Sequence, residues 1–198
     1  MRSFYPMRRH KQQLSQEKCF EILEKGSSGT LALLDKQGFP YSVPLSYVFF
    51  PGKATEAQIP ESQILHPNGE KPASAETQDN LGSIYFHSAL EGHKIDAIRN
   101  CAKASFCVIA ADDVIPEKFT TAYRSVIVFG EVRVVKDDTN RKLGLELLGR
   151  KYSPNFEEAM QSEIANAFDR TAIIELKIEK ITGKEGLELT KHGIINEG

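Results

Sequence analysis

The chain has 198 residues, of which 40% are hydrophobic and 26% are charged, and 25 Lys and Arg stand against 27 Asp and Glu, for a formal charge of −2. This length and apolar content suit one domain with its own core, so we expect a single domain over residues 1–198. The balanced charge excludes a general nucleic-acid binder, and no apolar run approaches the ~18–20 residues that a membrane span needs.

The N-terminus and the cysteines indicate the compartment. The stretch MRSFYPMRRHKQQ has basic residues but no apolar segment behind them, so it is not a secretory signal. The three cysteines, Cys19, Cys101 and Cys107, lack the spacing of a zinc site, and we predict no metal site. An odd number of cysteines without a signal predicts a reduced, cytoplasmic protein. None has basic neighbours that would favour a reactive thiolate, so we expect buried structural thiols.

A helix and two strands are predicted first along the chain. Residues 15–25 have Ser15 as a candidate N-cap, and Gly26 can end the helix. Residues 30–34 are strand-like, residues 35–38 supply a turn, and residues 41–47 alternate as on a half-buried strand. Pro44 lies inside this second strand. Because proline cannot donate to a ladder, Pro44 marks an edge, a bulge or backbone that faces a ligand.

Residues 51–82 break the pattern. This stretch is rich in Pro, Gly, Ser, Ala and Glu and has little periodicity. A connection of roughly thirty residues far exceeds the usual hairpin, so we interpret it as an insertion at a hairpin tip. His66 lies within it beside turn residues, and we expect no functional role for it.

The rest of the chain predicts strands with helices at corners and ends. We expect a strand over 83–87, a helix that buries Ile95 and Ile98, a strand over 103–110 and a loop over 112–123. A long strand follows over 124–136, with a bulge or bend at Gly130. Asp137 or Asp138 caps a helix to about 152, a second helix runs from 154 to about 168, the last strand covers 171–185, and residues 190–198 form a tail.

This succession predicts a mainly β protein with peripheral helices. About six strands, many of them adjacent in sequence, favour a closed or partly closed antiparallel barrel. Regular alternation of strand and helix is missing, which argues against a doubly wound parallel sheet.

Two basic residues, His93 and Lys94, fall at the start of the helix after residues 83–87. The positive end of the helix dipole disfavours cations there. One interpretation is local: Ser88 and Glu91 form a capping box, while His93 and Lys94 are solvated surface. The other is functional: free N–H groups, a hydroxyl and two basic side chains form a phosphate cradle. No P-loop or G-x-G-x-x-G motif is present, so such a phosphate would be held in another way.

Several blocks of the sequence resemble a known family. They are GTLALLDKQGFPYSVPLSYVFF, SIYFHSALEGHKIDAIRNCAKASF, PEKFTTAYRSVIVFGEVRVV, LLGRKYSP and the closing ITGKE. The sequence resembles the flavin-binding split-barrel proteins related to pyridoxamine 5′-phosphate oxidase, and within them the Nim-type 5-nitroimidazole resistance proteins. The resemblance covers most of the chain outside the insertion and both tails.

The resemblance implies a split β-barrel, a six-stranded antiparallel barrel with short helices, and a homodimer with two FMN sites at the subunit interface. It implies that His93 and Lys94 bind the FMN phosphate, and that His87 and Ser88 continue the pocket wall. The partner subunit would reach the flavin from the position of Arg124 and Ser125, with residues 117–123 in the same wall. The strand residues beside the isoalloxazine would be Val43, Pro44, Leu45, Ser46 and Tyr47.

The implied function is an FMN-dependent reductase of small, electron-poor nitroaromatics such as 5-nitroimidazoles. His87 would donate protons near the substrate, which an imidazole can do near neutral pH. The alternative is a flavin- or haem-binding protein without turnover, in which His87 or His93 could be an axial ligand. The insertion departs from the family, and we find no basic groups near the C-terminus for a pyridoxal phosphate product.

Overall fold

The computed structural model describes residues 4–8, 10–52 and 80–193. Most of the predicted insertion, with His66, and the end of the predicted tail lie outside these residues. Five helices are described: α1 (Gln16–Lys25), α2 (His93–Asn100), α3 (Asp138–Tyr152), α4 (Glu157–Ala167) and α5 (Leu187–Gly193). Seven strands are described: β1 (Ser28–Leu34), β2 (Pro40–Ser46), β3 (Val48–Phe50), β4 (Ser83–Ala89), β5 (Lys103–Ile115), β6 (Thr120–Val134) and β7 (Thr171–Glu185).

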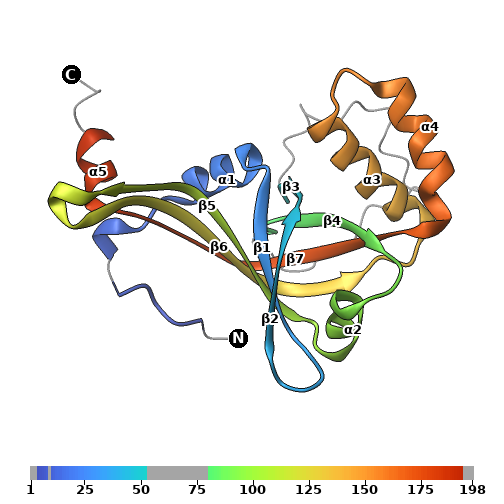
Figure 1. The fold of residues 1–198 in the computed structure, drawn as a ribbon, viewed down its shortest axis with the longest axis horizontal. Coiled ribbons are helices and arrows are strands. Elements are labelled where there is room, and N and C mark those ends of the chain that lie inside the picture. The colour runs from blue at the N-terminus through green and yellow to red at the C-terminus, as the bar shows by residue number, and fades with distance from the viewer. Residues whose placement is uncertain (1–3, 9, 53–79, 194–198) are drawn as a thin grey trace.

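The strands form one antiparallel sheet in the order β2-β1-β5-β6-β7-β4-β3, with helices around it (Figure 1). This confirms the prediction of a mainly β protein with peripheral helices. The described strands number seven rather than six, because β3 is a short strand beyond the predicted residues 41–47. Pro44 lies in the edge strand β2, where its missing N–H costs no ladder bond.

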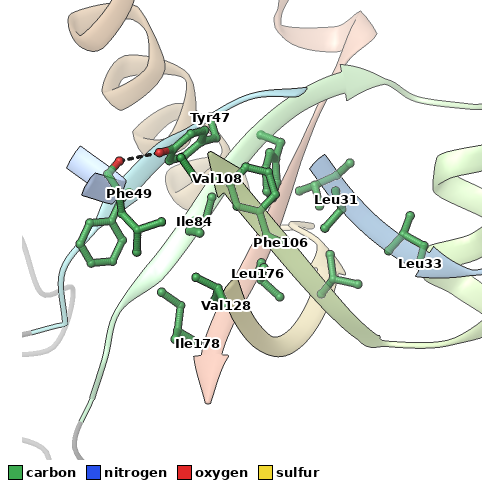
Figure 2. Close-up of a cluster of buried hydrophobic side chains, with 14 of the residues drawn as sticks. Leu31, Leu33, Tyr47, Phe49, Ile84, Phe106, Val108, Val128, Leu176 and Ile178 are labelled. Carbon is green, nitrogen blue, oxygen red and sulfur yellow. Dashed lines mark hydrogen bonds between the residues drawn. The ribbon is translucent and has the colours of Figure 1, made fainter. Parts of the chain in front are cut away.

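One residue joins the two edges of the sheet. β2 lies at one edge and β3 at the other, yet only Tyr47 separates them in sequence. The sheet must therefore curl until its edges approach, although they do not pair and the barrel stays open. Tyr47 is fully buried, its hydroxyl donates to the Leu23 carbonyl over 2.8 Å, and Figure 2 shows its ring among the core side chains.

The main core fills the inside of the curled sheet. Its fully buried members include Leu31, Phe86, Phe106 and Leu176, and Phe106 meets Phe86 edge to face with ring centroids 5.1 Å apart. Burial of such side chains contributes roughly 1.5–3 kcal/mol each. A second cluster lies on the outer side of the sheet, where α3 packs; its members are Val48, Tyr85, Val135, Leu148 and Ile173.

Several local predictions are confirmed. The Ser15 hydroxyl accepts from the Lys18 N–H at 3.2 Å, and the Asp137 carboxylate accepts from the Asn140 N–H at 2.9 Å, so both act as N-caps. The β6–β7 register shifts at Gly130, where a Cβ would lie 1.9 Å from the Lys177 carbonyl oxygen. Only glycine therefore suits this bulge.

The predicted loop over 112–123 is wrong. β5 continues to Ile115 and β6 begins at Thr120, so these residues form a long hairpin that projects from the barrel (Figure 1). Asp112 and Asp113 are exposed in this ribbon. Charged residues are tolerated there because the ribbon lies away from the core, and the apolar alternation that marks a half-buried strand is lost.

The predicted capping box is also wrong. α2 begins at His93 and its N-cap is Gly92, with φ of 119° and no side-chain hydrogen bond. Ser88 instead lies in β4, paired with Ala172 of β7. The strand extends to Ala89, beyond the predicted residue 87, and places Ser88 too early to cap the helix.

The cysteine prediction holds in part. Cys19 lies on the buried side of α1, whereas Cys101 and Cys107 are half-buried, and all three are free thiols. Burial, with the nearby Glu17 charge, raises the pKa of Cys19 to about 11. No helix in the described part of the chain is long and apolar enough to cross a membrane.

Candidate functional site

The start of α2 lies against the β1–β2 hairpin. His93, the first residue of the helix, stacks on Tyr41 of β2 with ring centroids 4.1 Å apart and an interplanar angle of 26°. Its Nε2 lies 3.4 Å from Oδ2 of Asp35. The start of α2 thus contacts the beginning of β2, the strand that also carries the predicted residues 43–46.

Asp35 organises this contact, and the sequence analysis assigned it only to a turn. Its Oδ1 accepts the N–H groups of Gln37 and Phe39 at 2.9 and 2.8 Å. Burial raises the pKa of Asp35, but these two hydrogen bonds and His93 outweigh it, so the pKa lies below the ordinary value. An Asp that opens a turn commonly bonds the N–H two residues on, which was the available signal.

Lys94 follows His93 in the first turn and has no comparable partner. It is half-buried, and its side chain makes no ion pair or hydrogen bond with any residue in the described ranges. Burial lowers the pKa of Lys94, because desolvation penalises its charged form. With no side-chain cap on α2, the first N–H groups of the helix point outward beside this cation.

The predicted β2 residues line an edge strand. Val43 and Leu45 are half-buried and pack against the core, while the alternate residues Pro44 and Ser46 are exposed. Tyr47 turns fully into the core and is not available to a ligand as a side chain. β2 pairs with β1 on one side only, so half of its backbone groups have no partner strand.

His87 and Ser88 lie near the end of β4, in register with Ile173 and Ala172 of β7. His87 is exposed, Ser88 is half-buried, and neither side chain forms a hydrogen bond within the described part of the molecule. An exposed imidazole without a partner can exchange protons with solvent or with a bound molecule.

Arg124 and Ser125 lie in β6, on the projecting hairpin. The Arg124 guanidinium binds Glu185 of β7 through Nε at 2.9 Å and a terminal nitrogen at 2.8 Å. Figure 1 shows the β5–β6 turn at the left end of the molecule and α2 at its lower right. Arg124 and Ser125 pair with β5 and β7, whereas the start of α2 contacts the β1–β2 hairpin.

Two cavities accompany this site without containing it. One, of about 510 Å³, lies on the outer sheet face around buried Glu175, which accepts hydrogen bonds from Ser83, Tyr85 and Arg133. The other, of about 420 Å³, is lined by Met7, Arg8, Tyr123 and Lys184. Of the residues predicted for the flavin site, Tyr123, from the predicted wall over 117–123, lines the second cavity, and the others line neither. The described residues contain no group of three or more His, Cys, Asp or Glu that could hold a metal ion.

Residues 15–185 match the model of the pyridoxamine 5′-phosphate oxidase family. The chain belongs to this family. The match spans every strand of the sheet and ends with β7, so the family relationship covers the whole barrel. No curated protein sequence matches the chain significantly.

Solved structures share the fold at low identity. A candidate 5-nitroimidazole antibiotic resistance protein from Bacteroides thetaiotaomicron is 14% identical with a TM-score of 0.58, over 87% of this chain and 85% of that one. A flavocytochrome from Azotobacter vinelandii is 16% identical with a TM-score of 0.65, over 92% and 72%. An FAD- and haem-binding protein from Mycobacterium smegmatis is 19% identical with a TM-score of 0.63, over 89% and 74%. Flavin- and haem-binding proteins are therefore among the fold neighbours of this family member.

Proposed function

We propose that this member of the pyridoxamine 5′-phosphate oxidase family binds FMN at the start of α2 and along β2. As a homodimer it would reduce small, electron-poor aromatic compounds, with nitroaromatics such as 5-nitroimidazoles as the substrate class. The family relationship and the flavin-binding fold neighbours support a flavin protein. The proposal goes beyond these two findings in naming FMN as the flavin, a homodimer as the assembly and nitroaromatic reduction as the reaction.

The observation that carries the proposal is the state of Lys94. A half-buried ammonium without an acid partner in the described structure has a raised free energy, which an anion would lower. The open helix start adds N–H donors and the positive end of the dipole to the same place. Together these groups suit a terminal phosphate, whose oxygens accept several charge-assisted hydrogen bonds.

The resemblance implies that His93 binds the FMN phosphate together with Lys94, but in this proposal His93 mainly positions the helix. With Nε2 turned to Asp35 and its ring on Tyr41, it fixes the helix start against the hairpin. Its side chain remains 54% exposed, so it can still contribute to the phosphate site from the edge. Lys94 is therefore the leading phosphate ligand in this proposal.

β2 offers the surface for the ring system of the flavin. The unpaired backbone groups of an edge strand can bond to the polar edge of an isoalloxazine. Pro44 removes one N–H from this edge, and its exposed ring offers an apolar contact instead. His87 and Ser88 would close the other side.

The homodimer supplies the missing wall. Within one chain Arg124 and Ser125 pair with β5 and β7, whereas the start of α2 contacts the β1–β2 hairpin, so in this proposal a second copy brings them to the flavin. The hairpin that carries them also exposes large apolar residues: Ile109 is 65% exposed, Val114 69% and Phe119 98%. Apolar side chains gathered on a projecting hairpin favour contact with another protein surface.

In the proposed reaction the bound flavin supplies the electron transfer, and the chain supplies position and protons. His87, exposed at the end of β4, is the group that would donate a proton to the substrate. The flavin phosphate held by Lys94 would fix the distance between ring and imidazole.

The decisive experiment compares FMN with riboflavin on the Lys94→Ala variant. Loss of a charge-assisted contact costs roughly 1.5–3 kcal/mol, so FMN should bind about tenfold more weakly or worse, with riboflavin unchanged. Lys25→Ala is the control, since Lys25 lies on α1 and pairs with Glu21. Equal weakening of both ligands would remove Lys94 from the phosphate site, and a Soret band in the purified protein would favour the haem-binding alternative.

A further inference from the structure

The second cavity joins three distant parts of the chain. Met7 and Arg8 come from the N-terminal segment, Tyr123 from β6 and Lys184 from β7, and they line an open cavity of about 420 Å³. The segment is held at this place by a tilted contact between the rings of Phe4 and Phe129, whose centroids lie 5.8 Å apart. The backbone bridge between Gln13 and Lys184 holds it from the other side.

Among the described residues, the lining of this cavity carries two cations and no acid. Arg8 and Lys184 make no ion pair within this part of the chain. The nearest acid in sequence, Glu185, is taken by the bidentate contact from Arg124 and by the hydroxyl of Thr190. Lys184 Nζ lies 5.1 Å from the centroid of the Tyr123 ring, a cation–π contact that attracts the ammonium group without neutralising its charge.

The chemistry of the lining selects a type of ligand. Two cations without an acid partner among the described residues suit a phosphoryl group, which carries about −1.5 to −2 charges at pH 7, better than a single carboxylate. Tyr123 and Met7 add an aromatic ring and a thioether, which suit a planar apolar group. A volume of about 420 Å³ exceeds what a phosphate needs and falls in the usual range of small-molecule sites.

We propose that this cavity binds the phosphoryl group of a nucleotide, at a place separate from Lys94. Within the proposed function, which this inference deepens, two nucleotides could supply that group: the adenylate half of FAD, or a nicotinamide nucleotide that donates electrons. Ser125 pairs with Lys184 in the β6–β7 ladder, so the cavity borders the part of the hairpin proposed to meet the flavin of the second copy.

The test titrates FMN, FAD, NADH, NADPH and inorganic pyrophosphate into the wild-type chain and into Lys184→Gln and Arg8→Gln. Lys180→Gln is the matched control, because Lys180 is an exposed lysine of the same strand and does not line the cavity. We expect both cavity variants to bind pyrophosphate, and whichever of FAD, NADH and NADPH uses the cavity, about tenfold more weakly or worse, with the affinity for FMN unchanged. Two independent variants protect the test against misfolding of one.

The pattern of loss identifies the source. A loss for FAD alone assigns the adenylate half, a loss for both nicotinamide nucleotides assigns the electron donor, and a loss for NADPH alone assigns its extra phosphate. The inference is overturned if every ligand binds as before, or if FMN weakens as much as the others. Failure of the proposed function is distinguishable. It would be seen in the binding of FMN to Lys94→Ala, whereas the binding of pyrophosphate and of the nicotinamide nucleotides tests the cavity without any flavin.

Discussion

Nε2 of His93 lies 3.4 Å from Oδ2 of Asp35, and this contact joins the start of α2 to the turn between β1 and β2. The carboxylate already accepts two backbone hydrogen bonds from its own turn. The pair therefore couples the shape of the turn to the orientation of the helix. Because Lys94 is the next residue, the contact between His93 and Asp35 also fixes where Lys94 lies.

Asp35→Asn should separate these two roles. The amide oxygen can still accept the bonds of the turn, but the negative charge beside His93 is lost. We expect FMN to bind as tightly as in the wild type or more tightly, because an anion near the phosphate has been removed. A substantial loss of FMN affinity on titration would mean that the carboxylate is needed to shape the site.

The pH dependence of the same variant checks the charge of Asp35. Its pKa in the folded chain lies below the unfolded value of about 3.9. Such a group contributes stability above the unfolded pKa and loses it as the pH falls through the folded pKa. Urea unfolding should therefore separate wild type from Asp35→Asn at pH 6, and the separation should shrink below about pH 4.

His87→Gln tests the proposed proton donor. The residue is exposed at the end of β4, so the substitution should leave the fold unchanged, and the rate is measured at saturating FMN because His87 also lies in the proposed pocket wall. Removal of a general acid typically costs 10²–10⁴-fold, and we expect a loss of about that size in the rate of nitroimidazole reduction. The pH profile of the wild-type rate should lose an inflection in the variant. An unchanged rate with an unchanged profile would assign the proton to solvent.

The sequence predicted the parts of the fold that local chemistry determines. Ser15, Asp137 and Gly130 were identified because a cap or a bulge needs those residue types. The β5–β6 hairpin was missed because its ribbon projects from the core and lacks alternation. Ser88 was misassigned because its spacing to Glu91 imitates a capping box while tertiary pairing with Ala172 extends the strand.

The candidate site was predictable only in part. Lys94 and the β2 edge could be proposed from position and from Pro44. The partner of His93 could not, since Asp35 is distant in sequence and meets it only through the packing of α2 on β1. The cavity around Lys184 likewise depends on three segments that only the folded chain assembles.

Tyr152→Phe tests the hydrogen bonds that join α3 to Tyr47, the residue between the two edge strands. The Tyr47 N–H donates to the Tyr152 hydroxyl over 2.9 Å, and that hydroxyl also faces the carbonyls of Tyr47 and Ser27. Phenylalanine would leave the Tyr47 N–H without its partner, at a cost of about 1–3 kcal/mol. Urea unfolding measures this loss. Tyr5→Phe is the control, since Tyr5 is 98% exposed and should change nothing; equal stability of the two variants would contradict a bridging role.

Lys151 contacts the same region around Tyr47, and its effect on the stability of the fold should depend on pH. Its Nζ donates to the Gly26 carbonyl over 2.6 Å and lies 4.1 Å from the centroid of the Tyr47 ring. Burial lowers the pKa of Lys151 from 10.5 to about 8. Between these values the unfolded chain binds a proton that the folded chain has released, so the Lys151 contribution to stability rises with pH.

The expected result is a difference between two proteins measured at two pH values. Wild type should gain stability relative to Lys151→Met when thermal unfolding at pH 7 is compared with pH 9. The raised pKa of Cys19 acts in the opposite direction, because a thiol that stays protonated in the fold loses stability as pH rises above about 9. That loss occurs in both proteins and cancels in the comparison. A constant difference between them would show that the Lys151 ammonium is as well solvated in the folded chain as in the unfolded one.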